Sequence, residues 1–488
     1  MRFWFVLCCL WAASAAITSC GGGGSGASSD PAPPVVDQGL APAVPYRGTV
    51  ILASPTRDSV RLNLYAPDQS GTVWINWGTS PNALIRQTAK TTLVAGEALE
   101  LQLTGLQAGT QHYYTLTYTP NAQTSTSISD VQAFYTARQP GSNFTFALQG
   151  DSHPERQPLQ FNPDLYQRTL DTAAADKPDF YILMGDDFSV DTLDPLRITK
   201  EQVIGRYTLQ RPYLGRIGKS TPLFLVNGNH EQAAGYMLDG TPDNVAVWAQ
   251  NARIALYSPP VPDGFYTGNT QTVPYIGLLR NYFAWTWGDA LFVVIDPYWP
   301  SQVPVDNVFG GSAKRQSSMW EVTHGDAQYQ WLRQTLEQSK ARYKFVFAHH
   351  VMGTGRGGIE LAGLWEWGGR NAKGMVEFSN QRPSWARPIH QLMVDNKVTI
   401  FFQGHDHVWV RQQLDGVTYQ TVSEPADANY ALYFSEAYTT GDKFPNSGYT
   451  RVSVSGDAVK VDYVRSVLPA DEKIQGKHGS TVFSYTLR

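Results

Sequence analysis

Five apolar runs in this sequence each end in polar residues of the kinds that bind metal ions. They are "ALQGDSH" (147–153), "LMGDD" (183–187), "LVNGNHE" (225–231), "FVFAHH" (345–350) and "FFQGHDH" (401–407). Apolar runs of this length, alternating with segments of helical periodicity, indicate βαβ units and a parallel sheet. Ligands of open α/β sheets bind beyond the carboxyl ends of the strands. The five polar ends should therefore converge in space.

The donor types at these strand ends predict a metal centre. Six of the ten histidines lie there, together with aspartates and asparagine, and no cysteine. Imidazoles mixed with oxygen ligands suit Zn²⁺, Mn²⁺, Fe or Co rather than a thiolate site. The donors are too many for one ion, so we expect two ions bridged by a central carboxylate. Two ions about 3.5–4 Å apart can hold the attacking and leaving oxygens of a displacement at phosphorus.

The blocks "GDSH", "GDD", "GNHE", "AHH" and "GHDH" resemble, in order and spacing, those of the calcineurin-like metallophosphoesterases. The resemblance covers residues 143–465. It implies a four-layer α/β/β/α sandwich. It also implies a phosphate ester substrate, either a monoester or a diester, hydrolysed by direct in-line attack of a metal-bound hydroxide.

The same resemblance implies a role for each residue of the blocks. The first ion would bind Asp151, His153 and His407, and the second would bind Asn229, His349 and His405. Asp186 would bridge the two ions. His230 would bind no metal; it would stabilise charge at the phosphate or protonate the leaving oxygen.

Two departures from the related purple acid phosphatases bear on the metals. Ser189 stands where those enzymes have the tyrosine that binds Fe³⁺, and His153 has no counterpart in them. The centre should therefore be uncoloured and of the divalent type. The fourth block lacks the proline that often follows its histidine pair. His350 therefore remains an alternative ligand to His349, which the resemblance favours.

Residues beside the blocks have structural interpretations. Asp187 should satisfy loop amides, and Glu231 should orient its neighbours or cap a turn. His405 and His407 stand two positions apart at a strand end, which should turn both to one side and Asp406 away.

Other polar residues lie outside the five blocks, and the neighbouring sequence does not determine their roles. "GTGRGG" (353–358) either presents Arg356 and backbone amides to a phosphate or is a flexible glycine loop. His112, His324, His390 and His478 are interpreted as structural or surface residues. The long segments 232–280 and 300–322, with 363–374, have little regular pattern and should wall the substrate cleft.

The first twenty residues resemble a bacterial lipoprotein signal: one arginine, an apolar run and "ITSC". The resemblance implies a signal peptide over residues 1–19, lipidation of Cys20 and an extracytoplasmic, membrane-anchored protein. An ordinary secretory signal is the alternative. The other cysteines are Cys8 and Cys9, so the mature chain would hold no disulfide. Residues 20–44 have the Gly, Ser and Pro content of a tether.

Residues 45–140 differ from the rest in having only short β-type runs, which predict an all-β sandwich. Within them, "LTGLQAGTQHYYTLTY" resembles the late strands of fibronectin type III-like domains, which precede the catalytic domain in many purple acid phosphatase-like enzymes. An α/β phosphoesterase domain should fill residues 141–488. In it we expect helices over 164–175 and 200–217, and a second sheet completed by the C-terminal strands.

Charge and composition limit the partners. The net charge is −4 and no long basic run is present, so nothing indicates a nucleic-acid surface. Two alternatives to a general phosphoesterase stay open: a phosphodiesterase specific for nucleotides or lipid head groups, and a catalytically inert surface-binding lipoprotein. The sequence does not indicate an oligomeric state.

Overall fold

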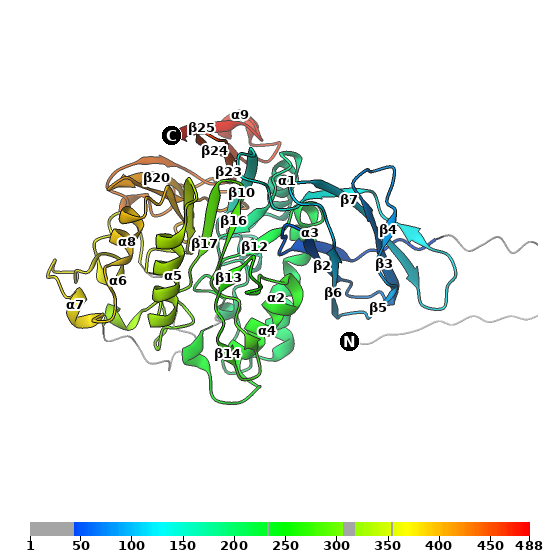
Figure 1. Cartoon of the computed structure of the whole chain (residues 1–488), viewed down its shortest axis with the longest axis horizontal. Helices are drawn as coiled ribbons and strands as arrows, with labels where there is room; N and C mark the ends of the chain where they lie inside the picture. The colour runs from blue at the N-terminus through cyan, green and yellow to red at the C-terminus, as the bar shows by residue number, and fades with distance from the viewer. Residues whose placement is uncertain (1–42, 232–233, 306–317, 353–354) are drawn as a thin grey trace, which may run out of the picture. The chain divides into compact units, whose positions relative to one another are not determined.

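The computed structural model in Figure 1 describes residues 43–488 apart from 232–233, 306–317 and 353–354. The predicted signal peptide, Cys20 and nearly all of the predicted tether lie outside the described residues. Among the described residues, no helix combines the length and the apolar character that crossing a bilayer requires.

Two large β-sheets form the centre of the α/β part. The first has nine strands in the order β25-β24-β23-β10-β11-β12-β1-β2-β6. Their bounds are β1 (Thr49–Ala53), β2 (Ser59–Tyr65), β6 (Ala98–Thr104), β10 (Phe144–Gln149), β11 (Tyr181–Leu183), β12 (Leu223–Leu225), β23 (Gly448–Val454), β24 (Val459–Arg465) and β25 (Thr481–Leu487). β10, β11 and β12 run parallel, and the register aligns their last residues, Gln149, Leu183 and Leu225. The loops after these three strands therefore emerge at one edge of the sheet.

The second sheet has eight strands in the order β13-β16-β17-β18-β19-β21-β20-β22. Their bounds are β13 (Thr267–Gly268), β16 (Phe283–Trp287), β17 (Ala290–Val294), β18 (Tyr343–Phe347), β19 (Ile400–Gln403), β20 (Trp409–Leu414), β21 (Val417–Thr421) and β22 (Asp442–Phe444). β17, β18, β19 and β21 run parallel to their neighbours in that series. Their carboxyl ends form the matching edge of this sheet.

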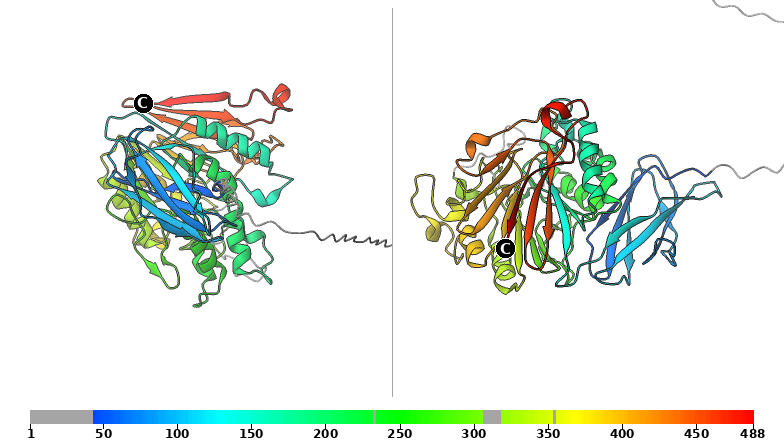
Figure 2. Two further views of the ribbon diagram at one scale, coloured as in Figure 1. Left: turned by 90° about the vertical axis from the view of Figure 1, so that its right-hand side faces the viewer. Right: turned by 90° about the horizontal axis from the view of Figure 1, so that it is seen from above.

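Alternation along the strands builds four layers. Phe146 and Leu148 of β10 belong to the apolar cluster between the sheets, which also holds Phe345 and Phe347 of β18. The intervening Ala147 faces a second cluster, since successive side chains of a strand point to opposite faces. Figure 2 shows helices on both outer sides of the paired sheets. The predicted α/β/β/α sandwich is confirmed.

The helices divide between the two outer faces. Those covering the first sheet are α1 (Pro163–Ala175), α2 (Lys200–Leu209), α3 (Arg211–Gly218) and α4 (Val245–Tyr257), and those covering the second include α5 (Asp326–Gln338), α6 (Trp365–Gly368), α7 (Phe378–Gln381) and α8 (Ile389–Asp395). Shorter elements are α9 (Glu472–Gln475), the 3-10 turns η1 (Pro154–Arg156), η2 (Val190–Thr192), η3 (Gly235–Met237), η4 (Met319–Glu321) and η5 (Ser435–Ala437), and the hairpin of β14 (Thr272–Val273) and β15 (Gly277–Leu278).

Residues 49–135 form an all-β sandwich. Strands β1, β2 and β6 face a second layer made of β3 (Gly71–Gly78), β4 (Arg86–Gln87), β5 (Thr91–Leu93), β7 (Gln111–Pro120), β8 (Ser127–Ile128) and β9 (Gln132–Tyr135). Leu62, Ile75 and Tyr118 are among the buried residues that fill the space between these layers. β1 also pairs with β12 through Ala53 and Leu223. The first sheet is thus continuous from the sandwich into the α/β part.

Three element predictions need correction. The helix expected over 200–217 is two helices, α2 and α3, because Pro212 lacks an amide hydrogen and instead lies in the first turn of a new helix that begins at Arg211. Segment 232–280, expected to be irregular, contains α4, whose first turn is capped by the side chain of Asn244. Of the C-terminal strands, β21 joins the second sheet as expected, but the last three do not; β23 pairs with β10, so they extend the first.

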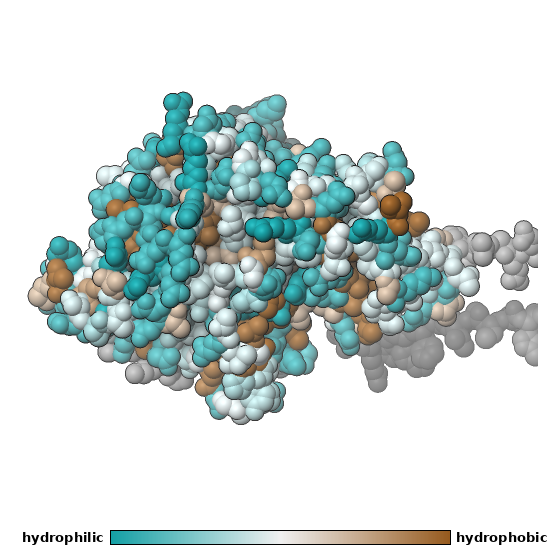
Figure 3. Space-filling model, viewed as in Figure 1, coloured by the Kyte–Doolittle hydropathy of each residue, from teal (hydrophilic) through white to brown (hydrophobic). Residues whose placement is uncertain are grey.

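The face of the molecule seen in Figure 3 is mainly hydrophilic, with small separate apolar patches. Exposed large apolar side chains such as Ile85, Leu196 and Ile474 come from distant parts of the chain. Scattered apolar residues of this kind are normal on a protein surface. On this face, therefore, no single apolar area dominates.

Candidate metal centre

Polar residues from strand ends of both sheets come together in one buried cluster. Four of them, from the ends of β10, β11, β18 and β19, have donor atoms that all lie within 4.8 Å of one another: Asp151, Asp186, His349 and His405. His349 Nε2 lies 2.9 Å from Asp186 Oδ2 and 3.2 Å from His405 Nδ1. All four side chains are buried. This group contains two carboxylates and two imidazoles, a donor set that suits a divalent metal ion.

A second group of donors shares Asp151 with the first. It consists of Asp151, His153 and His407. His407 Nε2 lies 3.3 Å from Asp151 Oδ2, and His153 Nε2 lies 3.9 Å from the same oxygen. Neither Asp151 Oδ2 nor His153 Nε2 has a hydrogen-bond partner among the described residues, although both atoms are buried. Buried polar atoms without partners are costly unless a ligand satisfies them, so the residues fit a bound cation.

Asp186 is likewise shared between two groups. It joins His153 and His230 in a third set of donors. The backbone amide of His230 donates to Asp186 Oδ1 at 2.9 Å, which holds the Asn229–His230 segment against this carboxylate. Asn229 is 3% exposed at the same sheet edge. The predicted ligands from all five blocks therefore lie at one place.

The charges of the cluster balance one another. Burial alone would raise the pKa of the Asp151 and Asp186 carboxyls, but the imidazole of His349, first among the neighbouring groups, holds the pKa of both well below the usual range. Burial lowers the pKa of His349, yet the Asp186 and Asp151 carboxylates outweigh it and raise that pKa to about 10. Ionised carboxylates facing protonated imidazoles are the arrangement in which a metal ion can displace protons.

Left-handed backbone conformations aim several of these side chains. Asp186, His153, His405 and His407 have φ values of 58°, 45°, 69° and 51°. Strand β19 ends at Gln403, before the two histidines. The side chains of His405 and His407 do face the same side, but strand alternation does not explain it, because neither residue is in the strand. Instead, the left-handed conformations on either side of Asp406 turn both imidazoles inward. Such strained residues persist where the surrounding structure fixes them, commonly at functional sites.

Close backbone approach explains two glycines of the blocks. A Cβ atom on Gly228 would lie 2.2 Å from Asp186 Oδ1, and one on Gly404 would lie 2.6 Å from Asp151 Oδ1. Neither carboxylate could move away without leaving its donor group. The glycines of "GNHE" and "GHDH" are thus required by the packing of the cluster.

Each imidazole of the cluster is oriented by a partner on its other nitrogen. His407 Nδ1 lies 2.7 Å from Glu424 Oε2, and His349 Nδ1 lies 2.8 Å from the carbonyl of Met184. Partners of this kind fix the ring and its tautomer at metal sites. Sequence reasoning missed Glu424, which follows β21. A sixth strand ending in "TVSE" at the same sheet edge was the available signal.

His153 is held in a similar way. Its Nδ1 lies 3.0 Å from Ser189 Oγ and 3.2 Å from Glu155 Oε1. Burial, with the charge of Arg156, lowers the pKa of His153 to about 4. The neutral ring can therefore offer Nε2 to a cation. Glu155 was also missed, because its only sequence signal is its place two residues after His153.

His230 stands beside the cluster with two partners that the sequence did not indicate. Its Nδ1 lies 2.8 Å from both carboxylate oxygens of Asp191, and its Nε2 lies 3.2 Å from Arg156 Nη2. The same Nε2 is 3.7 Å from Asp186 Oδ2. Burial lowers the pKa of His230, but Asp186 and Asp191 outweigh it and raise that pKa to about 9. A half-buried imidazole so placed can donate a proton toward the cluster.

The loop residues beside the blocks have structural partners. Glu231, not Asp187, satisfies loop amides: its carboxylate accepts from the backbone of Asp187, Phe188 and Gly228 at 2.6–3.2 Å. The side chain of Asp187 instead accepts from Ser152 Oγ at 2.6 Å. Glu231 therefore ties the second and third blocks together.

The structure distinguishes the two alternatives around the fourth block. His350 Nε2 lies 3.1 Å from the carbonyl of Gly357, outside the donor groups, whereas His349 belongs to the first of them.

Arg356 is held beside the fifth block. It donates to the carbonyl of His405 and lies 3.1 Å from Asp406 Oδ1, with its guanidinium 4.0 Å over the ring of Phe434. Asp406 points away from the donors and toward Arg356, as the sequence predicts. Arg356 is thus attached to the fifth block and remains 36% exposed.

The four remaining histidines lie outside the cluster. His112 and His390 contact Gln107 and Tyr419, and His478 contacts Thr172. His324 Nδ1 lies 3.1 Å from the carboxylate of Glu366. None of the four belongs to a donor group among the described residues.

Described parts of the long inserted segments line a cavity of about 410 Å³. Its walls include Gly235, Leu238, Asn269, Trp299 and His324. The backbone of Gly235 donates to the carbonyl of Trp299, and the neighbouring Tyr298 ring lies 6.3 Å from the ring of His349. Tyr298, two residues before the second inserted segment, therefore places the start of that segment near the side of the donor cluster that carries His349. Contact of the inserted segments with a substrate remains a prediction.

The layered fold and the buried Asp/His cluster define a metal-dependent phosphoester hydrolase. Residues 144–409 match the model of the calcineurin-like phosphoesterase family, and the chain belongs to that family. No curated protein matches the sequence.

Two solved structures share the fold over most of the chain. A structure of PhoD is 16% identical, with a TM-score of 0.59, and the match covers 90% of this chain and 89% of that one. The purple acid phosphatase PPD1 from yellow lupin (Lupinus luteus) seeds is 15% identical, with a TM-score of 0.56, and the match covers 90% and 73%. Similarity at this level of identity establishes the architecture.

Proposed function

We propose that the protein hydrolyses phosphomonoesters or phosphodiesters with two metal ions held in the buried cluster. The observation that carries this proposal is that Asp151 and Asp186 each belong to two different groups of donors. Shared carboxylates of this kind allow two cations to lie side by side. Bound cations lower the pKa of water and stabilise charge on phosphoryl oxygens.

In this proposal the first ion takes Asp151, His153 and His407, the second takes Asn229, His349 and His405, and Asp186 bridges them. The short distances from His407 to Asp151 and from His349 to Asp186 support this division. Mn²⁺, Zn²⁺, Fe and Co remain compatible with the donors. The hydroxyl of Ser189 contacts His153 Nδ1, which supports an uncoloured centre without a phenolate ligand.

His230 is proposed to act on the phosphoryl group during a direct in-line displacement by hydroxide. Asp191 occupies Nδ1, so Nε2 is the atom directed toward the cluster. From there the imidazole can stabilise charge on a phosphoryl oxygen or give a proton to the leaving oxygen. Arg156, next to this Nε2, adds positive charge at the same place.

Arg356 is proposed as a further contact to the substrate phosphate. Its guanidinium is half-exposed and is held beside the fifth block by Asp406. An arginine with free N–H groups matches the oxygens of a phosphate well. If the loop is only structural, replacing Arg356 with Gln will leave the KM for a phosphate ester unchanged.

The location of the protein is a separate proposal. Lipidation of Cys20 would anchor the chain to a membrane on the extracytoplasmic side, with residues 20–44 as a tether. The arrangement of β1, β2 and β6 against β3, β4 and β7 supports a fibronectin type III-like sandwich over 45–140. Metabolic labelling with a fatty-acid analogue tests the anchor: wild-type protein should be labelled and a Cys20→Ala variant should not.

The catalytic proposal is tested by metal analysis and two chromogenic esters. Purified, tag-free protein should contain two metal ions per chain by elemental analysis. It should cleave p-nitrophenyl phosphate or bis-p-nitrophenyl phosphate with Mn²⁺, Zn²⁺, Fe or Co. The ratio of the two rates separates a monoesterase from a diesterase of the kind that acts on nucleotides or lipid head groups. Absence of metal even after reconstitution, with neither ester cleaved, would favour the alternative of an inert surface-binding lipoprotein.

A further inference from the structure

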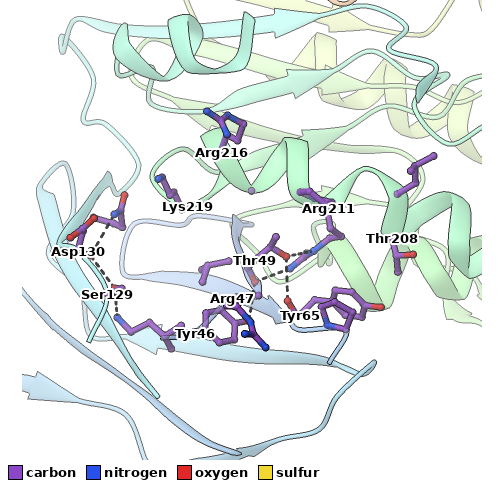
Figure 4. A pocket seen from close by; sticks show the side chains of 18 of the residues that line it. Tyr46, Arg47, Thr49, Tyr65, Ser129, Asp130, Thr208, Arg211, Arg216 and Lys219 are labelled. Carbon is purple, nitrogen blue, oxygen red and sulfur yellow. Dashed lines mark hydrogen bonds between the residues drawn. The ribbon is translucent and has the colours of Figure 1, made fainter. Parts of the chain in front are cut away.

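A cavity of about 810 Å³ lies between the β-sandwich and helices α2 and α3, away from the metal centre. Figure 4 shows Tyr46, Thr49 and Tyr65 on the side of the sandwich, facing Arg211 and Lys219 on the side of the helices. None of the proposed metal ligands lines it. Pockets that hold small molecules commonly have volumes of about 300–1,000 Å³.

The lining combines aromatic surface with positive charge. Its aromatic and aliphatic members include Tyr46, Tyr65, Tyr114, Leu116 and Leu209. Its cationic members are Arg47, Arg211, Arg216 and Lys219, whereas Asp130 is the one acidic residue among the lining residues. This composition favours a ligand with an aromatic or other apolar body and a negative charge.

The four cations differ in how strongly they are engaged. Arg211 is 1% exposed and donates to Thr49, Asn63 and the carbonyl of Leu256, so it builds the wall. Arg216 forms two hydrogen bonds with Asp171 at 2.5–2.8 Å. Lys219 is exposed, and its ammonium forms no ion pair with any described residue. Arg47 forms an ion pair with Asp68 at 3.3 Å. Lys219 is therefore the charge most available to an anionic ligand.

The helix junction that forms one wall of the cavity also supports the metal centre. Thr208, Leu209 and Arg211 line the cavity, while Gln210 between them points the other way. Gln210 Nε2 lies 2.6 Å from Ser152 Oγ and 2.8 Å from the carbonyl of Asp187, and its side chain is fully buried. Ser152 separates Asp151 from His153, and Asp187 follows Asp186. A shift of this junction would therefore move the first two metal-binding blocks.

We propose that this cavity binds a small aromatic anion, and that occupancy changes the rate of phosphoester hydrolysis through Gln210. The binding half of the proposal is independent of the proposed function. The proposed effect on the hydrolysis rate rests on the proposed function. Binding and rate are measured in separate experiments, so that failure of one does not obscure the other.

The binding test uses 8-anilinonaphthalene-1-sulfonate, an aromatic anion that fluoresces in apolar surroundings. Full-length folded protein should give saturable fluorescence enhancement. Gly205 lines the cavity, and a Cβ atom on it meets nothing within 4 Å, so a side chain can begin there and Gly205→Trp should narrow the cavity. We expect that variant to bind at least about tenfold more weakly, a change of about 1.4 kcal/mol.

The matched control is Gly456→Trp, at the hairpin between β23 and β24, where a Cβ atom also meets nothing within 4 Å. It should bind the probe as the wild type does. Lys219→Glu keeps the cavity open and reverses one charge, so its affinity should fall several-fold, and more at low salt than at high salt. Equal affinity in wild type, Gly205→Trp and Lys219→Glu overturns the binding site.

The rate test measures hydrolysis of p-nitrophenyl phosphate with and without saturating probe. We expect at least a twofold change in rate for the wild type and for Gly456→Trp, and none for Gly205→Trp. Saturable binding without any change in rate overturns the coupling through Gln210 and leaves the ligand site in place. An inactive wild type that still binds the probe refutes the proposed function, and with it the rate half, but leaves the binding site standing.

Discussion

Two buried sets of histidine and carboxylate side chains in this protein differ in how completely their carboxylate oxygens are satisfied. In the metal centre, Asp151 Oδ2 and His153 Nε2 have no hydrogen-bond partner among the described residues. In a second set, here called the outer network (Thr323, His324, Glu366 and Arg382), Glu366 Oε1 accepts from Thr323 and Arg382, and Oε2 accepts from His324. Burial of His beside a carboxylate is common to both sets. His324 Nε2 also lacks a hydrogen-bond partner, but it belongs to no donor group among the described residues. A carboxylate oxygen left over beside converging imidazoles distinguishes the first set.

The groups that neutralise the carboxylates also differ between the two sets. The outer network contains an arginine that neutralises Glu366 permanently. The carboxylates of the metal centre face imidazoles, which can lose their protons to make way for a cation. The metal centre is therefore built to exchange protons for metal, and the outer network is built to hold its segments together.

Replacing Asp186 with Ala should produce the largest effect. This change removes a carboxylate shared by two donor groups. The rate of ester hydrolysis should fall by about 10³-fold or more, since charge on the transferred group loses its stabilisation. Metal content per chain, measured by elemental analysis, should fall with it. Treating the wild type with a chelator should reproduce the loss, and added metal should restore the wild type alone. Full activity in the variant contradicts the bridging role.

Replacing Glu424 with Gln compares the two sets directly. Glu424 orients His407 from 2.7 Å, and partners of this kind typically contribute about 10–100-fold to metal affinity or activity. The matched control is Glu366→Gln, which alters the His–Glu contact of the outer network. Metal titration followed by activity should show weaker binding for Glu424→Gln and wild-type binding for Glu366→Gln. Equal metal affinity in the two variants would remove the distinction between the sets.

The same Glu366→Gln variant should instead lose stability. Removing the charge from a buried, fully hydrogen-bonded carboxylate should lower the free energy of unfolding by about 1–3 kcal/mol. Burial raises the pKa of Glu366, but the hydrogen bond and charge of His324, with Arg382, outweigh it and leave that pKa below its usual value. The carboxylate thus stabilises the fold at neutral pH, and this contribution is lost as pH falls below the ordinary glutamate range.

Denaturant unfolding of wild type and variant as a function of pH checks this sign. The difference in unfolding free energy should be largest near neutrality and should shrink on acidification. If the difference in unfolding free energy stays constant down to acid pH, the charge of Glu366 does not contribute to stability.

The convergence of these donors in one buried cluster could be predicted from the sequence because they lie next to one another in short blocks. "GDSH", "GNHE" and "GHDH" place donors within three residues of a glycine that the packing requires. The layered fold could be predicted from the alternation of strands and helices for the same reason. In both cases the determining interactions leave a local pattern.

The features that the sequence could not predict depend on contacts without such a pattern. Asp191 and Arg156 reach His230 from 39 and 74 residues away, and Glu424 reaches His407 across a whole hairpin. The strand pairing of β23 with β10 joins segments about 300 residues apart, and periodicity carries no information about which sheet a strand enters. The left-handed turns at His405 and His407 likewise have no signature in the side chains themselves.

A third His–carboxylate pair should show the smallest effect. His390 Nε2 lies 3.1 Å from Asp415 Oδ2, but the Asp415 side chain is 63% exposed. Asp415 has a φ of 49°, a left-handed conformation that Asn tolerates well, so Asp415→Asn removes the charge without straining the turn. Exposed ion pairs typically contribute about 0–1 kcal/mol, because water screens both charges. The unfolding free energy of this variant should therefore stay within that range of the wild type, and metal affinity should not change. A loss of unfolding free energy as large as that of Glu366→Gln would contradict this expectation. It would show that a His–carboxylate contact stabilises the fold equally whether it is exposed or buried.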